Sequence, residues 1–209
     1  MSINCINNST TVFNFDDISI NANTVSSTSG NLILATDGTN DIQFRNNSNL
    51  LLNMTFDGDL TIPLNPAFLA YKSSDSTSQT GAGAQITINF DTEVFDSNSN
   101  FASGTTFTAP ETGMYLFSFL VSFTSLTSSM DVGKVRLVTS NRTYQIELDA
   151  FNTVANSSLG GITGSAIADM DTADTATITL TIEDGAGNTA TISGSSSEMV
   201  TYFSGYKIA

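Results

Sequence analysis

The chain has 209 residues, of which 6 are Lys or Arg and 20 are Asp or Glu, so its formal net charge is −14, and it contains no His. Binding to a phosphate backbone needs cationic patches, so this balance disfavours nucleic acid as a partner. Only 12% of the residues are charged, and the chain has 15 Gly and no Trp. Surface positions must then be filled largely by Asn, Ser and Thr, which favours short strands and turns over helices.

No stretch approaches the roughly 18 apolar residues of a membrane-spanning helix, so we expect no membrane insertion. The start, MSINCINNSTTVFNFDD, lacks the basic region and the apolar segment of a signal peptide. We therefore expect the protein to be made in a host cytoplasm and to leave it by assembly into a particle or by lysis. The single cysteine, Cys5, excludes an internal disulfide and is interpreted as an unpaired thiol.

Residues 1–29 are rich in Asn, Ser and Thr, and we interpret them as an N-terminal arm that could anchor the chain to a particle. Residues 30–65 follow a sharper rule, because ten apolar side chains in 30–62 fall on even-numbered positions while the odd positions are mostly polar. Alternation of this kind predicts short strands with one buried face, separated by turns at Asp37-Gly38, Asn46-Asn47 and Asp57-Gly58. The even-numbered apolar residues are Leu32, Leu34, Ile42, Phe44, Leu50, Leu52, Met54, Phe56, Leu60 and Ile62.

This segment, which we call the stem, has too few apolar side chains to offset the entropy of ordering its backbone alone. Either it lies against the following domain, or several copies wrap around a common axis and share one core. Its spacing resembles the β-structured stems of viral and phage fibres, in which three chains intertwine.

Residues 66–209 are predicted to form a separate head, beyond a hinge flanked by Pro63 and Pro66. Many short strands with turn signals between them indicate an all-β sandwich. The named strand predictions are 67–72, 86–90, 105–108, 114–123, 134–138, 143–150, 175–182 and 199–208.

The strand at 114–123 is apolar on both faces. Its odd positions are wholly apolar, and its even positions include Met114, Leu116 and Leu120. A strand with only one buried face would alternate with polar residues, so we expect both faces to be at least partly covered. The odd positions are Tyr115, Phe117, Phe119, Val121 and Phe123.

Four motifs occur in order: AFLAY at 67–71, FTAP at 107–110, GMYLFSF at 113–119 and FSGYKI at 203–208. In order and separation they resemble the globular head of complement C1q and its tumour necrosis factor relatives. Two positions depart from that pattern, because Ala173 replaces a turn glycine and Lys207 replaces a residue that is usually apolar. The matching residues are Phe68, Phe107, Pro110, Gly113, Tyr115, Phe117, Phe203 and Gly205.

The resemblance implies a ten-stranded jelly-roll sandwich that forms homotrimers. It implies that Tyr115, Phe117 and Phe119 fill the sandwich, while Leu116 and Leu120 face neighbouring subunits. Together with the stem, it suggests a non-enzymatic fibre on the surface of a virus or phage particle, whose head contacts a host receptor or glycan. Two alternatives remain open, a secreted or surface ligand of the same fold and a polysaccharide-degrading fibre enzyme.

Residues for catalysis are scarce, because the chain lacks His and no serine lies in a nucleophile elbow. We expect neither enzymatic activity nor a cofactor. Asp169, Asp171 and Asp174 are the best calcium candidates, but the Gly and Glu of an EF-hand loop are absent, so a solvated acidic turn is the simpler interpretation. Ligand contacts are expected in two exposed loops, at Thr80 and Gly83 and at Asp184 and Asn188.

Overall fold

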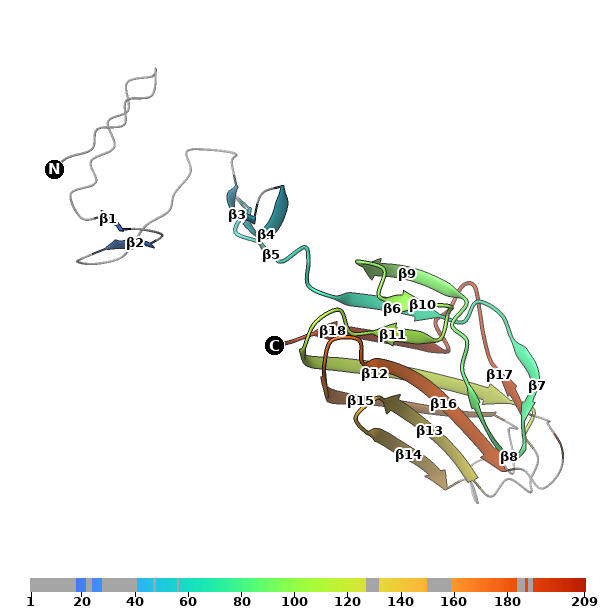
Figure 1. Ribbon diagram of the computed structural model, residues 1–209. Helices are drawn as coiled ribbons and strands as arrows, with labels where there is room; N and C mark the ends of the chain where they lie inside the picture. The colour runs from blue at the N-terminus through green and yellow to red at the C-terminus, as the bar shows by residue number, and fades with distance from the viewer. Residues whose placement is uncertain are drawn as a thin grey trace. The chain divides into compact units, whose positions relative to one another are not determined.

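The computed structural model describes residues 18–21, 24–27, 41–46, 48–55, 57–126, 132–149, 159–183, 187 and 190–209. The chain divides into two compact units, Met1–Ile62 and Pro63–Ala209. Among the described residues, no helix is long and apolar enough to cross a membrane. Among the described residues, the regular structure of both units consists of strands that pair antiparallel (Figure 1).

The first unit contains a hairpin and a small sheet. Strands β1 (Ile18–Asn21) and β2 (Thr24–Ser27) pair with each other. Strands β3 (Ile42–Asn46), β4 (Asn49–Met54) and β5 (Leu60–Thr61) form a three-stranded antiparallel sheet. The chain reverses after Asn46, between β3 and β4, and again between β4 and β5. In the second turn Gly58 has a φ of +93°, a conformation that glycine adopts without steric cost. The expected Asp37-Gly38 turn lies outside the described residues.

The register of the small sheet places its apolar residues on one face. Ile42 pairs with Met54, which also pairs with Leu60, and Phe44 pairs with Leu52. A bulge places Leu50 opposite Arg45 instead, so the even-number rule breaks at that point. Leu32, Leu34 and Phe56 lie outside the described residues.

In the single chain this apolar face is open to solvent. Phe44, Met54 and Leu60 are 50%, 44% and 58% exposed, whereas Asn53 on the reverse face is only 8% exposed. The physical reason is that three short strands make a single layer, and a sheet buries an apolar face only when a second layer covers it.

The second unit, the head, is a sandwich of two sheets (Figure 1). The larger sheet has the order β7-β17-β12-β18-β6-β9, and β15 pairs with the other side of β12. Its strands are β6 (Ala67–Tyr71), β7 (Ser76–Thr80), β9 (Thr92–Ser97), β12 (Gly113–Thr124), β15 (Leu159–Met170), β17 (Ala190–Ile192) and β18 (Tyr202–Lys207).

The smaller sheet has the order β10-β11-β16-β13-β14. Its strands are β10 (Phe101–Ala102), β11 (Thr106–Thr108), β13 (Val132–Thr139), β14 (Thr143–Asp149) and β16 (Thr175–Glu183). Strand β8 (Ala82–Thr87) runs beside β16, and just after it the Ile88 amide donates to the Ile178 carbonyl at 2.9 Å.

Aromatic rings fill the space between the two sheets. Phe68 lies at the centre, with ring centroids 4.9 Å from Phe101, 5.0 Å from Phe107 and 4.9 Å from Phe203. The odd-numbered side chains of β12 point into the same core and are at most 2% exposed. The all-β jelly-roll sandwich is thus confirmed. The described head residues hold more than the ten strands expected, because short segments such as β10 and β17 form separate strands.

The two departures from the family pattern are accommodated locally. Ala173 adopts a φ of +74° in the turn between β15 and β16, the conformation that a glycine would provide. The Lys207 ammonium lies 2.7 Å from the Glu111 carboxylate, so its charge has a partner at the end of the sandwich. Both the turn and the last strand keep their places in the fold.

Candidate functional site

The outward side of the larger sheet carries two rows of apolar and aromatic side chains. In the first row Leu116 on β12 is flanked by Ile167 on β15 and by Tyr206 on β18, which in turn pairs with Ala67 on β6. In the second row Leu120 is flanked by Thr163 and by Tyr202, which pairs with Tyr71. We call these two rows, with the residues between them, the outer face.

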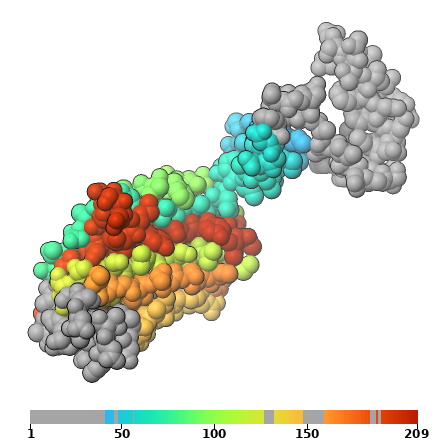
Figure 2. Space-filling view, turned by 180° about the vertical axis from the view of Figure 1, so that it is seen from behind, coloured from blue at the N-terminus to red at the C-terminus, as the bar shows by residue number. Residues whose placement is uncertain are grey.

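A strip of small polar residues separates the two rows. Ser118 pairs with Ser165 on one side and with Ser204 on the other, and Ser204 pairs with Leu69. Figure 2 shows the strands of this face as adjacent bands, with β18 in red, β12 in yellow-green and β15 in orange.

Much of the outer face is open to solvent in the single chain. Ile167 is 55% exposed and Tyr206 is 46% exposed, while Leu116 and Leu120 are half-buried because β12 has neighbours on both sides. Large exposed apolar patches mark interaction sites in soluble proteins.

Charge is nearly absent from the outer face, although the chain as a whole is strongly acidic. The two rows and the serine strip contain no Asp, Glu, Lys or Arg. The nearest charge along β15 is Asp169, which pairs with Met114 in the ladder. Depletion of charge at the centre of a patch is typical of protein interfaces.

Asp169 already has a cationic partner. Arg142 donates to both of its carboxylate oxygens, each at 3.0 Å. These hydrogen bonds, aided by the positive charge of Arg142, hold the pKa of Asp169 below its usual range. Both side chains are about 60% exposed, so the pair contributes little to stability.

The other two metal candidates are engaged in the same turn. The Asp174 carboxylate accepts from the Asn141 side chain at 3.0 Å and from the Asp171 amide at 2.8 Å. The Asp171 carboxylate lies 3.4 Å from the Thr112 hydroxyl. Within the part of the chain that the structure describes, no three His, Cys, Asp or Glu side chains are grouped as metal ligands.

The loop candidates are distributed differently from the sequence-based expectation. Thr80 is fully buried at the end of β7, and its hydroxyl donates to the Ala84 carbonyl at 2.7 Å. Its placement in an exposed loop is therefore wrong, because the hydroxyl closes the turn to β8 from inside. Gly83 is exposed, with a φ of +78°. Asp184 and Asn188, like Cys5, lie outside the described residues.

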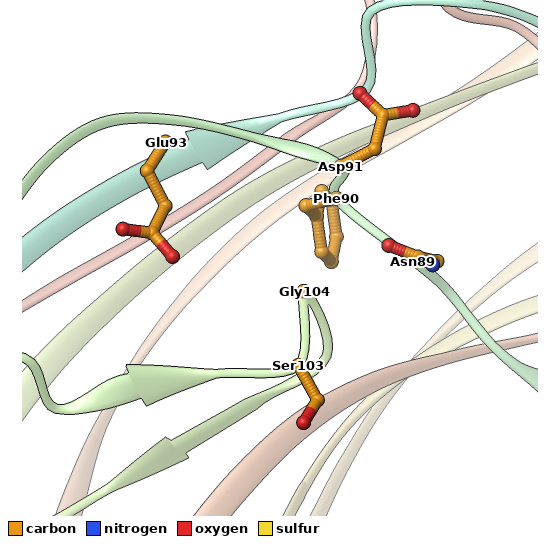
Figure 3. A pocket seen from close by; sticks show the side chains of 6 residues that line it. All are labelled: Asn89, Phe90, Asp91, Glu93, Ser103 and Gly104. Carbon is orange, nitrogen blue, oxygen red and sulfur yellow. The ribbon is translucent and has the colours of Figure 1, made fainter.

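An open pocket of about 430 Å³ lies beside β9 (Figure 3). It is lined by Asn89, Phe90, Asp91, Glu93, Ser103 and Gly104. In Figure 3 the Asp91 carboxylate points away from Glu93 and Ser103, which come from separate segments. The Asp91 carboxylate is also occupied, since it accepts from the Ser73 amide at 2.8 Å and from the Thr92 hydroxyl at 3.0 Å. These groups do not converge on a common ligand position, so the outer face remains the stronger candidate.

Sequence reasoning identified Leu116 and Leu120 but missed their neighbours Ile167 and Tyr206. Ile167 belongs to β15, a strand that was not among the named predictions. Tyr206 belongs to a predicted strand, but only the register with β12 places it beside Leu116. Strand order is a long-range property that alternation within one strand does not report.

The model of a known domain family matches most of the head. The model of the C1q domain matches residues 67–208. Domains of this family typically form homotrimers and are generally non-enzymatic. No curated protein matches the sequence.

The chain is also similar to solved structures, among them the following three. The globular domain of zebrafish complement 1qA protein is 20% identical, with a TM-score of 0.46 over 69% of this chain and 98% of that one. Murine APRIL at pH 5.0 is 14% identical, with a TM-score of 0.48 over 69% and 99%. The Eiger tumour necrosis factor from S. frugiperda is 13% identical, with a TM-score of 0.43 over 70% and 92%.

Proposed function

The chain belongs to the C1q domain family, and from this premise we propose that it is a non-enzymatic homotrimer that acts as a binding protein. The observation that carries the proposal is the outer face. A chain of net charge −14 keeps two rows around Leu116 and Leu120 free of charge and leaves Ile167 and Tyr206 about half exposed.

The outer face suits contact between identical subunits for an electrostatic reason. Acidic copies repel one another, and the repulsion is strongest where like charges would be desolvated against each other. A charge-free apolar patch avoids that cost and gains from burial. Cyclic symmetry then allows three copies to close a ring in which each outer face is covered.

We further propose that the trimer is a surface fibre of a virus or phage particle. In this proposal the arm, residues 1–29, attaches to the particle, and the head contacts a host receptor or glycan. The support is the separate unit Met1–Ile62, with its own three-stranded sheet. A secreted or surface ligand of the same fold is the alternative, with the same trimeric head but no particle.

The trimer is tested by sedimentation velocity at micromolar concentration. The wild-type chain is expected to sediment as a trimer. Leu116→Asp should shift it toward monomer, because the new carboxylate would be desolvated at the interface without a partner. The matched control is Val138→Asp, at a half-buried outward position on β13 in the other sheet, which should leave the trimer intact. A wild-type monomer would contradict the proposal.

The particle assignment needs a separate experiment. Antibodies against residues 63–209 should label the surface of intact particles in electron microscopy. Protein found only in particle-free supernatant would favour the ligand. Cleavage of a polysaccharide by the purified chain would favour the enzyme.

A further inference from the structure

The three-stranded sheet of β3, β4 and β5, which we call the stem sheet, has an apolar face that is open to solvent in the single chain. Ile42, Phe44, Leu52, Met54 and Leu60 share this face by register, and none of them is charged. Phe44, Met54 and Leu60 are between 44% and 58% exposed. A face of this kind in a three-stranded sheet needs a covering layer, because a single layer cannot remove its own side chains from water.

The reverse face of the sheet has partners of its own. The Asn53 side chain, 8% exposed, donates to the Asp41 carboxylate at 2.9 Å. The Thr61 hydroxyl lies 3.5 Å from the Asn53 carbonyl. The Asn53 Oδ1 atom is buried with no hydrogen-bond partner among the described residues. Asn53 is nevertheless covered within the chain, whereas the apolar face is open to solvent.

The connection from the stem sheet to the head is two residues long. β5 ends at Thr61, and the Leu64 carbonyl already accepts from the Asn98 side chain of the head at 3.2 Å. The next residue, Asn65, donates to the Lys207 carbonyl at 3.0 Å. Only Ile62 and Pro63 lie between, and proline further restricts the backbone there.

We propose that the apolar face of the β3–β5 sheet is covered by the same face of the other copies of this chain, so that the three stem sheets share one core. This inference rests on the proposed trimer. A trimeric head with so short a connector holds three identical stem sheets together, at an effective concentration of about millimolar. A foreign partner would have to be supplied at a comparable concentration.

The chemistry of the face also favours a second copy. In so acidic a chain, identical charged faces would repel each other. The apolar face of the stem sheet carries no charge, and its acidic neighbours Asp41, Asp57 and Asp59 lie outside it. The side chains of this face differ in size and shape, from Ile42 and Met54 to Phe44, which allows them to interdigitate with a second copy.

The test uses the full-length chain with Cys5→Ser, so that any introduced thiol is the only one. Leu60→Cys reports on the apolar face. Thr61→Cys is the matched control, because it is the adjacent residue, is also exposed, and pairs with Asn53 on the reverse face. Maleimide labelling rates are measured for both variants, native and unfolded, together with disulfide formation under mild oxidant and the sedimentation coefficient.

We expect a trimer in which Leu60→Cys reacts at least tenfold more slowly than Thr61→Cys and forms interchain disulfides, while Thr61→Cys forms none. The unfolded samples should label at equal rates. A trimer with equal native rates would overturn this inference and leave the proposed trimer standing. Protection of Leu60→Cys without an interchain disulfide would mean that the chain itself or a foreign molecule covers the face, which also overturns it. A monomer with both thiols reactive would overturn the proposed function as well.

Discussion

Ala173 adopts a left-handed backbone conformation, with a φ of +74°, in the turn that joins β15 to β16. The turn is closed by the Asp174 amide, which donates to the Asp171 carbonyl at 3.0 Å, and by the Ala173 amide, which donates to the Ala109 carbonyl at 2.8 Å. A non-glycine residue in this conformation costs about 1–2 kcal/mol, so the turn holds Ala173 against its own preference.

Ala173→Gly is therefore expected to stabilise the head by about 0.5–1 kcal/mol, the relief of strain less the extra entropy of glycine in the unfolded chain. Thermal or urea unfolding measures the difference. Ala102→Gly, at an exposed strand position, is the control and should destabilise, since it adds the entropy without relieving strain. A destabilised Ala173→Gly variant would show that the turn is not strained.

Lys72 and Asp91 form the most buried ion pair that the described residues contain. The Lys72 side chain is 5% exposed, and its ammonium lies 3.7 Å from the Asp91 carboxylate. Burial raises the pKa of Asp91, but hydrogen bonds from Ser73 and Thr92 and the charge of Lys72 outweigh it, so the pKa lies below its usual range. A carboxylate of this kind stabilises the fold above its unfolded pKa, and the contribution is lost as the pH falls through the folded pKa.

Asp91→Asn should consequently lower the melting temperature at pH 7, where Lys72 would lose its counter-charge. The difference from the wild-type chain should shrink as the pH falls below about 4 and vanish below the folded pKa. Glu93→Gln, at an exposed position in the same segment, is the comparison and should show little effect at either pH. A deficit in Asp91→Asn that persists unchanged at pH 2 would argue against an electrostatic origin.

At the scale of elements, the ladder between β12 and β15 runs over twelve residue pairs, from Gly113 opposite Met170 to Thr124 opposite Leu159. Glycines on β15 make room for large side chains of the core. A Cβ at Gly160 would overlap the Phe123 ring, and a Cβ at Gly164 would overlap the Phe119 ring and Ile146. Because glycine has no side chain, β15 can lie directly over these aromatic rings. Larger residues at the same two positions would collide with them.

Gly164→Ala is expected to lower the free energy of unfolding by about 1–3 kcal/mol, because the core must shift to admit one methyl group. Gly161→Ala is the matched control on the same strand, since its Cβ would come no closer than 3.6 Å to the Ser122 hydroxyl. Denaturant unfolding of both variants at one protein concentration measures the contrast. Equal losses of stability in the two variants would mean that the core accepts a methyl group at Gly164 without strain.

The same glycines explain which elements could be predicted from the sequence. β12 was expected at 114–123 and spans Gly113–Thr124, because large alternating side chains mark it. β15 was not among the named strands, because in LGGITGSAIADM four of the six inward positions are Gly or Ala, which mark a strand weakly in sequence. The strand expected at 86–90 lies instead at Ala82–Thr87, where few apolar residues mark it.

Only part of the candidate site could be predicted from the sequence. Leu116 and Leu120 stand out because a strand with both faces apolar needs two covering layers. The family motifs then supplied a reason for the second layer. Ile167 and Tyr206 look ordinary in sequence, and they join the site only through the pairing of β12 with β15 and β18.

At the scale of the whole molecule, the two units are expected to differ in their ability to fold independently. Among its described residues, the head has a core of 25 buried apolar side chains, all within residues 68–203. The stem sheet has one open apolar face. Residues 63–209 expressed alone should therefore fold and form a trimer, whereas residues 1–62 alone should not form a stable sheet, because separate chains must first find one register.

Circular dichroism and mass measurement on the two fragments test this division. Cooperative unfolding is expected for residues 63–209, and a largely unordered spectrum for residues 1–62. A stable, β-rich trimer of the stem beside an unfolded head would reverse the assigned roles.

The chain enters the head through β6, which is paired on both sides, with β18 through Ala67–Tyr206 to Tyr71–Tyr202 and with β9 through Ala67–Ser97 to Tyr71–Thr92. A tensile load applied to the preceding residues along the direction of β6 would act on both ladders in shear. Their hydrogen bonds would then share the force and have to rupture together, whereas an edge strand such as β14 can be peeled one bond at a time. The head is therefore joined to the preceding residues through a strand whose two ladders resist extension together.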